Sequence, residues 1–330
     1  MKKKLNIIAE IGSVHDGSFG NAKNLVILAK NCGATHVKFQ LHIPESESLK
    51  DAPAPSYFTN EKRYNYFKRT AFTISQWKEL LDFSLKNKVE FVISPFSKKA
   101  LSIINSIGCK NIKIPSGEVT NRLLLESISK TNKNLFLSTG MNNWKEIDQA
   151  VEILKKNNLT IMQCSSLYPC PSEKIGLNII KEMKRKYNLP VGLSDHSNGM
   201  AAGVGAIALG AETIEKHITF SNAMYGSDAC NAMEPTEFKI FSKELKNIWK
   251  IINNPVNKDD TSDYLLTKKV FEKSLVLKKN ISKGSIISIA YIDSKKPGDG
   301  ISVMKYKEVL GKKVKSNLKK NHKLKKSDLC

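Results

Sequence analysis

Residues 190–217 have the sequence PVGLSDHSNGMAAGVGAIALGAETIEKH. Two short apolar runs, Pro190–Ser194 and Thr213–His217, flank a longer stretch of small residues, Met200–Leu209. Runs of about five residues suit buried strands, and the stretch between them suits a helix. The segment therefore predicts one strand–helix–strand unit, with polar side chains directly after the first strand and at the end of the second.

The same alternation recurs along the first 255 residues. The other predicted strands are Leu5–Ala9, His36–Gln40, Glu90–Ser94, Lys110–Ile114, Asn134–Ser138 and Thr160–Cys164. The other predicted helices are Asn21–Cys32, Ser75–Asn87, Lys98–Ile107, Arg122–Lys130, Trp144–Asn157, Ile175–Tyr187 and Pro235–Ile252. Eight such alternations over about 250 residues are typical of an α/β fold, the (β/α)8 or TIM barrel. A doubly wound open sheet is the alternative, but residues 10–17, EIGSVHDG, match neither GxGxxG nor a P-loop.

The texture of the sequence changes after the last predicted helix. Residues 253–263 are polar and turn-rich, and the rest of the chain carries short alternating runs at Ser274–Leu277, Ser285–Ile289 and Lys312–Val314. We therefore expect a barrel domain over residues 1–255, a linker over 256–271 and a small β-rich domain over 272–330.

Composition excludes several classes of protein. The net charge of the 330 residues is +22, but only four of the 53 basic residues are arginine. Nucleic-acid binders favour arginine, so we interpret the lysine-rich run Lys312–Lys326 as a solvated face and expect no nucleic-acid partner. No apolar run approaches the roughly 20 residues that a membrane span needs. The apolar run Leu5–Ala9 is cut short by Glu10, and six scattered cysteines suit reduced thiols, so we expect a cytoplasmic protein.

Polar groups follow every predicted strand. In a TIM barrel the active site forms at the carboxyl ends of the strands. Serine hydroxyls and one lysine there suit an oxyanion such as phosphate or carboxylate. These residues are Lys38, Ser94, Ser116, Ser138, Ser166 and Ser194.

Histidines and acidic residues at the same strand ends suggest further chemistry. His196 and His217 end neighbouring strands, so their imidazoles can converge on a divalent metal. His15 is a third candidate ligand, whereas we interpret His36, His42 and His322 as structural or surface residues. Glu10 and Glu118 are potential acid–base groups. A Schiff-base aldolase that uses Lys38 or Lys216 is an alternative.

The motifs together resemble the sialic acid synthase family, whose members condense phosphoenolpyruvate with an N-acetylmannosamine-type aldose. They are Glu10-Ile-Gly, Val37-Lys-Phe-Gln, Ser94-Pro-Phe, Pro115-Ser-Gly-Glu, Leu137-Ser-Thr-Gly-Met, Cys164 to Tyr168-Pro, Gly192-Leu-Ser-Asp-His and Glu215-Lys-His. The tail, residues 278–329, resembles the antifreeze-like SAF (β-clip) domain that closes these enzymes.

The resemblance implies a role for each matching residue. His196 and His217 match metal ligands, for manganese or for magnesium or cobalt. The set that matches phosphoenolpyruvate binding is Glu10, Lys38, Ser94, Ser116, Ser138, Ser166 and Ser194. The set that matches positions facing the acceptor sugar is Glu118, Tyr168 and Asp228. Glu10, Glu118 and Lys38 are the expected catalytic groups, and a homodimer is implied in which the SAF domain of one copy caps the barrel of the other.

Two departures leave the acceptor sugar open. Lys296 stands where sialate enzymes place an arginine that contacts the N-acyl group of the sugar, and lysine lacks the planar fork. The segment Lys50–Phe72, rich in proline and aromatic residues, is expected to form a long lid-like loop. A synthase of sialate, legionaminate, pseudaminate or another nine-carbon sugar acid is therefore expected.

Overall fold

The computed structural model of the chain describes residues 4–53 and 61–330. The chain divides into two compact units, Met1–Asn254 and Pro255–Cys330, and each is described by itself. Within the described residues, no helix combines the length and the apolar character that crossing a membrane requires.

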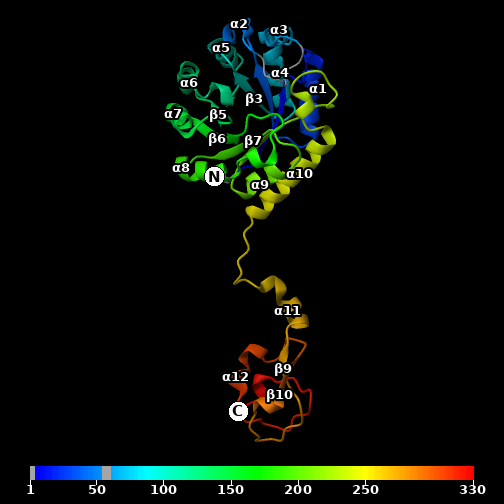
Figure 1. Cartoon of the computed structure of the whole chain (residues 1–330). Helices are drawn as coiled ribbons and strands as arrows, with labels where there is room; N and C mark the ends of the chain where they lie inside the picture. The colour runs from blue at the N-terminus through cyan, green and yellow to red at the C-terminus, as the bar shows by residue number, and fades with distance from the viewer. Residues whose placement is uncertain (1–3, 54–60) are drawn as a thin grey trace. The chain divides into compact units, whose positions relative to one another are not determined.

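The first unit is a closed barrel of eight parallel strands, paired in chain order with β8 closing on β1 (Figure 1). The strands are β1 (Asn6–Gly12), β2 (His36–Leu41), β3 (Glu90–Pro95), β4 (Asn111–Ile114), β5 (Asn134–Ser138), β6 (Asn158–Cys164), β7 (Val191–Asp195) and β8 (Thr213–His217). The predicted (β/α)8 barrel is confirmed, and all eight predicted strands are present with ends shifted by at most two residues, except at β1. That strand continues past Glu10 to Gly12, because the buried Glu10 is tolerated inside the barrel.

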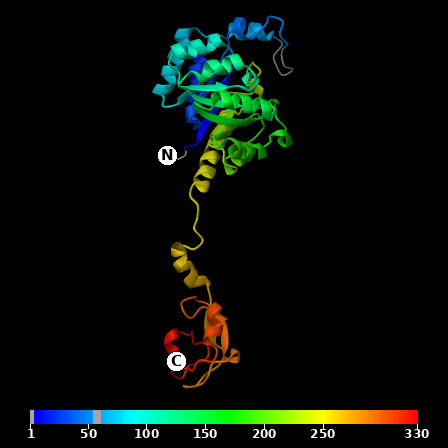
Figure 2. The same ribbon diagram turned by 90° about the vertical axis from the view of Figure 1, so that its left-hand side faces the viewer.

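Helices surround the barrel strands in both views (Figures 1 and 2). They are α1 (Phe19–Asn31), α4 (Ile74–Lys86), α5 (Lys98–Ser106), α6 (Arg122–Ser129), α7 (Trp144–Leu154), α8 (Asn178–Tyr187), α9 (Ala201–Ala208) and α10 (Pro235–Ile252). Their starts follow local capping chemistry: Thr73 with Gln76 caps α4, and Asn143 with Glu146 caps α7.

The segment expected as a lid-like loop holds more order than the sequence indicates. A short helix, α2 (Pro44–Glu47), follows β2, and α3 (Arg63–Arg69) lies inside Lys50–Phe72. Residues 54–60 of that segment lie outside the described residues. A helix of seven residues without a side-chain cap gives too weak a periodic signal to predict, so α3 depends on tertiary packing.

The strands separate two cores. Side chains on the outer faces pack against the helices in one large apolar cluster that includes Phe39, Phe91 and Ile214. A smaller cluster of Ile8, Val92, Phe136 and Met162 is formed by alternate residues on the opposite, inner face. Two residues further along the same strands the inner positions become polar, as at Glu10, Ser94 and Ser138. The apolar layer therefore fills one level of the barrel and leaves the carboxyl ends for polar groups.

The second unit is small and β-rich, as predicted. Strand β9 (Ser274–Leu277) pairs antiparallel with β10 (Ile292–Lys295), and α11 (Leu265–Phe271) and α12 (Tyr306–Val309) flank them in the chain. Its core includes Leu277, Val309 and Leu324. The expected strands Ser285–Ile289 and Lys312–Val314 lie antiparallel, joined by the bridge between Ile286 and Lys313 and by backbone hydrogen bonds such as Ile287 N to Lys312 O at 2.9 Å. Gly284 and Gly311 turn the backbone beside them at φ +80° and +82°.

Close strand packing predicts a stability cost at Gly192. An added Cβ there would lie 2.6 Å from the backbone oxygen of Thr213 on β8. Gly192→Ala should lower the free energy of unfolding by about 1–3 kcal/mol, because backbone cannot yield as a side chain does. Gly117→Ala, where a Cβ meets nothing within 4 Å, is the matched control. Urea unfolding would measure both, and equal stability of the two variants would contradict the prediction.

Candidate active site

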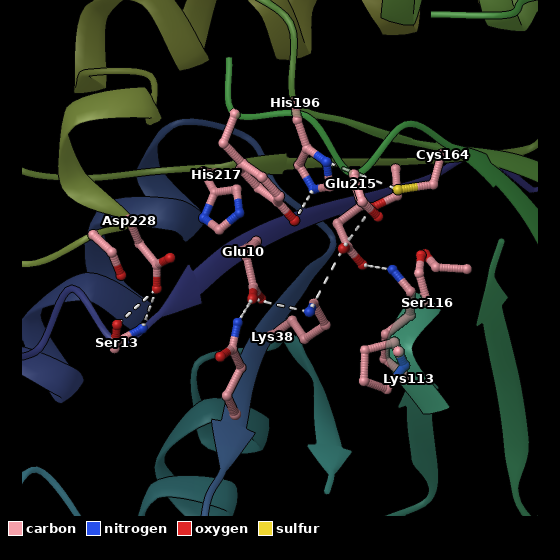
Figure 3. A pocket seen from close by; sticks show the side chains of 18 of the residues that line it. Glu10, Ser13, Lys38, Lys113, Ser116, Cys164, His196, Glu215, His217 and Asp228 are labelled. Carbon is pink, nitrogen blue, oxygen red and sulfur yellow. Dashed lines mark hydrogen bonds and ion pairs between the residues drawn. The ribbon is translucent and has the colours of Figure 1, made fainter. Parts of the chain in front are cut away.

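A cavity of about 280 Å³ opens where the barrel strands end (Figure 3). All but three of the predicted site residues line it. Those that line it are Glu10, Lys38, Ser116, Ser138, Ser166, Tyr168, Ser194, His196, His217 and Asp228. Side chains from all eight strands, or from the loops after them, thus meet in one space, as the polar residues at the strand ends predict. The exception is β3, which contributes Phe96 and not Ser94.

The other three predicted residues lie elsewhere. Ser94 is fully buried on β3 and does not line the cavity. The Glu118 carboxylate accepts a hydrogen bond from Asn121 at 2.7 Å, and burial raises its pKa. Lys296 belongs to the second unit, where its ammonium lies 5.0 Å from the ring of Phe271.

A network of four charged groups occupies the barrel interior. Lys38 lies 2.9 Å from Glu10 and 3.6 Å from Glu215, and Lys113 lies 2.6 Å from Glu215. The four side chains are at most 6% exposed. Gln40 donates a hydrogen bond to Glu10 at 2.7 Å, and Ser194 donates one to Glu215 at 3.0 Å.

The two carboxyl groups of this network differ in acidity. Burial raises the pKa of Glu10 to about 7, against the opposing attraction of Lys38. Burial acts in the same direction on Glu215, but the ammonium groups of Lys113 and Lys38 outweigh it and hold its pKa at about 2. Glu215 is therefore a permanent carboxylate, whereas Glu10 can hold or release a proton near neutral pH.

Among the residues that the structure describes, several buried polar atoms around the cavity have no hydrogen-bond partner. They are Glu10 Oε2, Ser94 Oγ, Ser138 Oγ and His217 Nδ1. An unsatisfied buried polar group costs about 1–3 kcal/mol. A polar ligand that reaches these atoms would remove that cost, so the arrangement indicates a ligand site for an oxygen-rich molecule.

The two histidines at the ends of β7 and β8 face the same space, and their ring centroids are 5.7 Å apart (Figure 3). His196 Nδ1 lies 2.9 Å from the backbone oxygen of Ser165, which sets Nε2 toward the cavity, 3.2 Å from the hydroxyl of Tyr168. Burial lowers the pKa of His217 to about 4, so its ring is neutral.

This donor set fits a divalent metal. Neutral imidazoles ligate such ions, and the buried His217 Nδ1 has no hydrogen-bond partner in the described part of the chain. Within residues 4–53 and 61–330, no group of three or more His, Cys, Asp or Glu side chains is arranged to hold a metal. A metal on this pair would keep open positions for water or substrate. The third candidate, His15, does not line the cavity and packs 4.6 Å from the ring of Phe72.

Asp228 is fixed at the cavity wall by the first loop. Its Oδ2 accepts hydrogen bonds from the backbone nitrogen of Ser13 at 2.8 Å and from the Ser13 hydroxyl at 2.7 Å. Gly12 has φ +54°, and a Cβ there would come within 2.3 Å of the same oxygen. Glycine is therefore required at this position for the carboxylate to approach.

Sequence reasoning did not select Lys113, Glu215 or His42. Strand alternation was the available signal for the first two, because Lys113 is on the inner face of β4 and Glu215 shares its face with His217. His42 was expected to be structural or on the surface. It lines the cavity instead, and its side chain is 7% exposed.

The raised pKa of Glu10 predicts a pH-dependent stability. Between pH 4.5 and 7 the folded chain keeps a proton on Glu10 that the unfolded chain has lost, so this contribution is present below pH 4.5 and is lost as pH rises through 7. Relative to Glu10→Gln, the free energy of unfolding of the wild type should fall by at most about 3 kcal/mol between pH 4.5 and 7.

Urea unfolding of both proteins at pH 5 and pH 7.5 measures this difference. Glu79→Gln, which removes an exposed carboxylate of α4, is the control and should show no such trend. A wild-type-to-E10Q difference that is the same at both pH values would mean that Glu10 stays ionised.

Comparisons with known proteins show the family of the chain. The NeuB family model matches residues 25–257, and the SAF domain model matches residues 272–329. The chain is 37% identical over 331 residues to the N,N'-diacetyllegionaminic acid synthase of Campylobacter jejuni, covering 97% of this chain and 98% of the relative. It is 31% identical to a pseudaminic acid synthase of the same species, with 99% and 97% covered.

A solved structure supports the same assignment. The N-acetylneuraminic acid (sialic acid) synthetase of Leptospira borgpetersenii superimposes with a TM-score of 0.73 at 30% identity, covering 80% of this chain and 90% of that one. With a family match over most of the barrel, relatives above 30% identity along nearly the whole length and the SAF domain after the barrel, the chain belongs to the NeuB family of sialic acid synthases.

Proposed function

We propose that this protein is a nonulosonic acid synthase, an enzyme that condenses phosphoenolpyruvate with an N-acyl amino hexose and releases phosphate. The observation that carries the proposal is one cavity in which a buried pair of lysines faces a pair of histidines. The relatives named as legionaminic, pseudaminic and N-acetylneuraminic acid synthases support the reaction class. A sialate, legionaminate or pseudaminate product would arise from the same type of reaction, with a different acceptor sugar in each case.

Phosphoenolpyruvate would bind over the charged network. When Glu10 holds its proton, Lys38 and Lys113 face a single carboxylate, Glu215, and an excess positive charge is left for an anion. Hydroxyl groups on the same rim can donate to the phosphate and carboxylate oxygens. They belong to Ser116, Ser138 and Ser166. The Ser194 hydroxyl donates to Glu215 in this structure, and Ser94 is buried on β3 outside the cavity lining.

The histidine pair would hold a divalent cation, manganese or else magnesium or cobalt. When bound, such an ion polarises a carbonyl oxygen as a Lewis acid. The chain's part is to orient both rings and to keep the His217 ring neutral. The backbone oxygen of Ser165 fixes the His196 ring, and burial keeps the proton off His217.

The reaction balances as an addition followed by an elimination. Carbon 3 of phosphoenolpyruvate bonds to the aldehyde carbon of the acceptor, and the aldehyde oxygen takes a proton to become a hydroxyl. Water adds to carbon 2 and gives up one proton, which balances the proton taken by the aldehyde oxygen. The new hydroxyl then loses its proton to the departing phosphate as the C–O bond breaks, and the keto acid is left. We assign proton transfer to Glu10, whose pKa lies near neutrality, with Lys38 holding the charge of the departing phosphate.

The acceptor would lie against Tyr168 and Asp228, which line the cavity beside the histidines, whereas Glu118 does not line it. The expected homodimer, in which the SAF domain of one copy covers the barrel of another and supplies Lys296, stays a prediction, as does a cytoplasmic location.

Phosphate release measures the proposed reaction. With phosphoenolpyruvate and manganese, we expect phosphate release that depends on an N-acyl hexose and stops when EDTA removes the metal. The acceptor panel contains N-acetylmannosamine, 2,4-diacetamido hexoses and unacylated mannose. If folded, metal-loaded protein releases no phosphate with any acceptor, and borohydride traps a pyruvate adduct, the protein would instead be a Schiff-base lyase.

His217→Ala tests the metal pair. The variant should keep its circular dichroism spectrum, bind manganese at least about 10-fold more weakly in calorimetry, and lose about 100-fold or more of its phosphate release. His322→Ala, a histidine of the second unit paired with Asp328, is the control. Unchanged manganese affinity in His217→Ala would place the metal elsewhere.

A further inference from the structure

Four planar side chains form a stack on one wall of the cavity. The Arg63 guanidinium lies 5.4 Å from the ring centroid of Phe67, which lies 3.6 Å from that of His42. The ring of Phe96 covers the other face of His42 at 4.1 Å. The two ring pairs are within 19° of parallel, and all four residues line the cavity.

Hydrogen bonds lock the centre of this stack. His42 Nδ1 lies 2.8 Å from Glu47 Oε1, and its Nε2 lies 3.0 Å from Gln40 Oε1. Gln40 in turn donates to Glu10. The imidazole can therefore neither rotate nor shift without disturbing the charged network, and it fixes the aromatic platform for Arg63.

The Arg63 guanidinium stacks on Phe67, but its N–H donors are not engaged by any described residue. The other arginine of α3, Arg69, pairs with Asp16 and Glu61 at 2.9 Å each and ties the helix to neighbouring loops. Within the described residues, the side chain of Arg63 makes neither an ion pair nor a hydrogen bond. A half-buried guanidinium in a cavity, with its donors unused, indicates a ligand acceptor group.

The surroundings of Arg63 indicate the kind of group. Phe67, Phe96 and Met141 give this wall an apolar surface. A phosphate against these side chains would lose its hydration there, with a single guanidinium to replace it. A neutral amide fits better, because the guanidinium can donate to its carbonyl oxygen while the rings contact its methyl group.

Topology indicates which amide it is. The stack comes from the segment after β2 and from the end of β3, whereas His196 and His217 follow β7 and β8. The acceptor aldehyde would lie at the histidines, so the stack meets a group remote from it. An acyl group on carbon 2 is next to the aldehyde, and one on carbon 4 is farther away.

We infer that Arg63, on its platform of Phe67, His42 and Phe96, is the specificity residue for a second N-acyl group of the acceptor. The inference rests on the proposed function. It assigns the preferred substrate class as a 2,4-diacylamido hexose rather than a hexose with one acyl group.

The test compares kcat/KM for a 2,4-diacetamido hexose and for N-acetylmannosamine in four proteins: wild type, Arg63→Ala, Arg63→Lys and Lys68→Ala. Wild type should prefer the diacetamido sugar. Arg63→Ala should lower kcat/KM for that sugar about 10- to 100-fold, mainly through KM, and leave N-acetylmannosamine and the KM for phosphoenolpyruvate within about 3-fold. Arg63→Lys should restore part of the loss, and Lys68→Ala, on the same helix with a 65% exposed side chain, should match wild type.

Other outcomes of this comparison would overturn either the role of Arg63 or the proposed function. Equal losses for both acceptors, with thermal stability unchanged, would make Arg63 a general support of the cavity. A wild-type preference for N-acetylmannosamine would assign Arg63 to a different group. No phosphate release by wild type with any acceptor would sink the proposed function and this inference together, whereas wild-type turnover with an unaltered preference in Arg63→Ala would sink the inference alone.

Discussion

Two ammonium and two carboxyl groups are buried together inside the barrel, so each charge must be balanced by another of the four. They belong to Lys38, Lys113, Glu10 and Glu215. Burying an ion costs several kcal/mol even after relaxation, and removing one member of a buried pair costs about 3–5 kcal/mol. Lys113 and Lys38 both approach Glu215, and Lys38 also approaches Glu10. The surroundings of these four groups must therefore be rigid, and the eight-stranded barrel supplies that rigidity by pairing every strand on both sides.

This constraint explains how the barrel is filled. Strand alternation gives each strand one inward residue at every second position, so apolar and polar levels must follow one another along the barrel axis. Ile8 and Val92 lie in the apolar level, and Glu10 and Ser94 follow them two residues later on the same strands. The charged network lies next to this apolar level, where the effective dielectric constant is low and a bound anion is strongly attracted.

The sequence was most informative where the signal is local. Apolar runs of five residues predicted all eight strands, and the residues at their ends predicted the histidine pair and the serine rim. Lys113 was not selected because it lies within a predicted strand and not after it, and only closure of the barrel brings it to Glu215 on β8. Arg63 and His42 escaped for a related reason: α3 is short, and packing of Tyr66 and Phe67 against the barrel loops holds it there.

Residues on the outer faces of β7 and β8 indicate that Lys216 is not a Schiff-base nucleophile. Asp195 and Lys216 precede His196 and His217 by one residue each, so alternation turns them away from the cavity. They form an ion pair of 2.7 Å, almost fully buried, and Lys216 also donates to the backbone oxygen of Ser197. A neutral, nucleophilic Lys216 would leave the buried Asp195 carboxylate without its counter-charge, which makes Lys216 a poor Schiff-base residue. The same pair braces the two strands directly behind the histidines, so it serves a metal-dependent mechanism better than a covalent one.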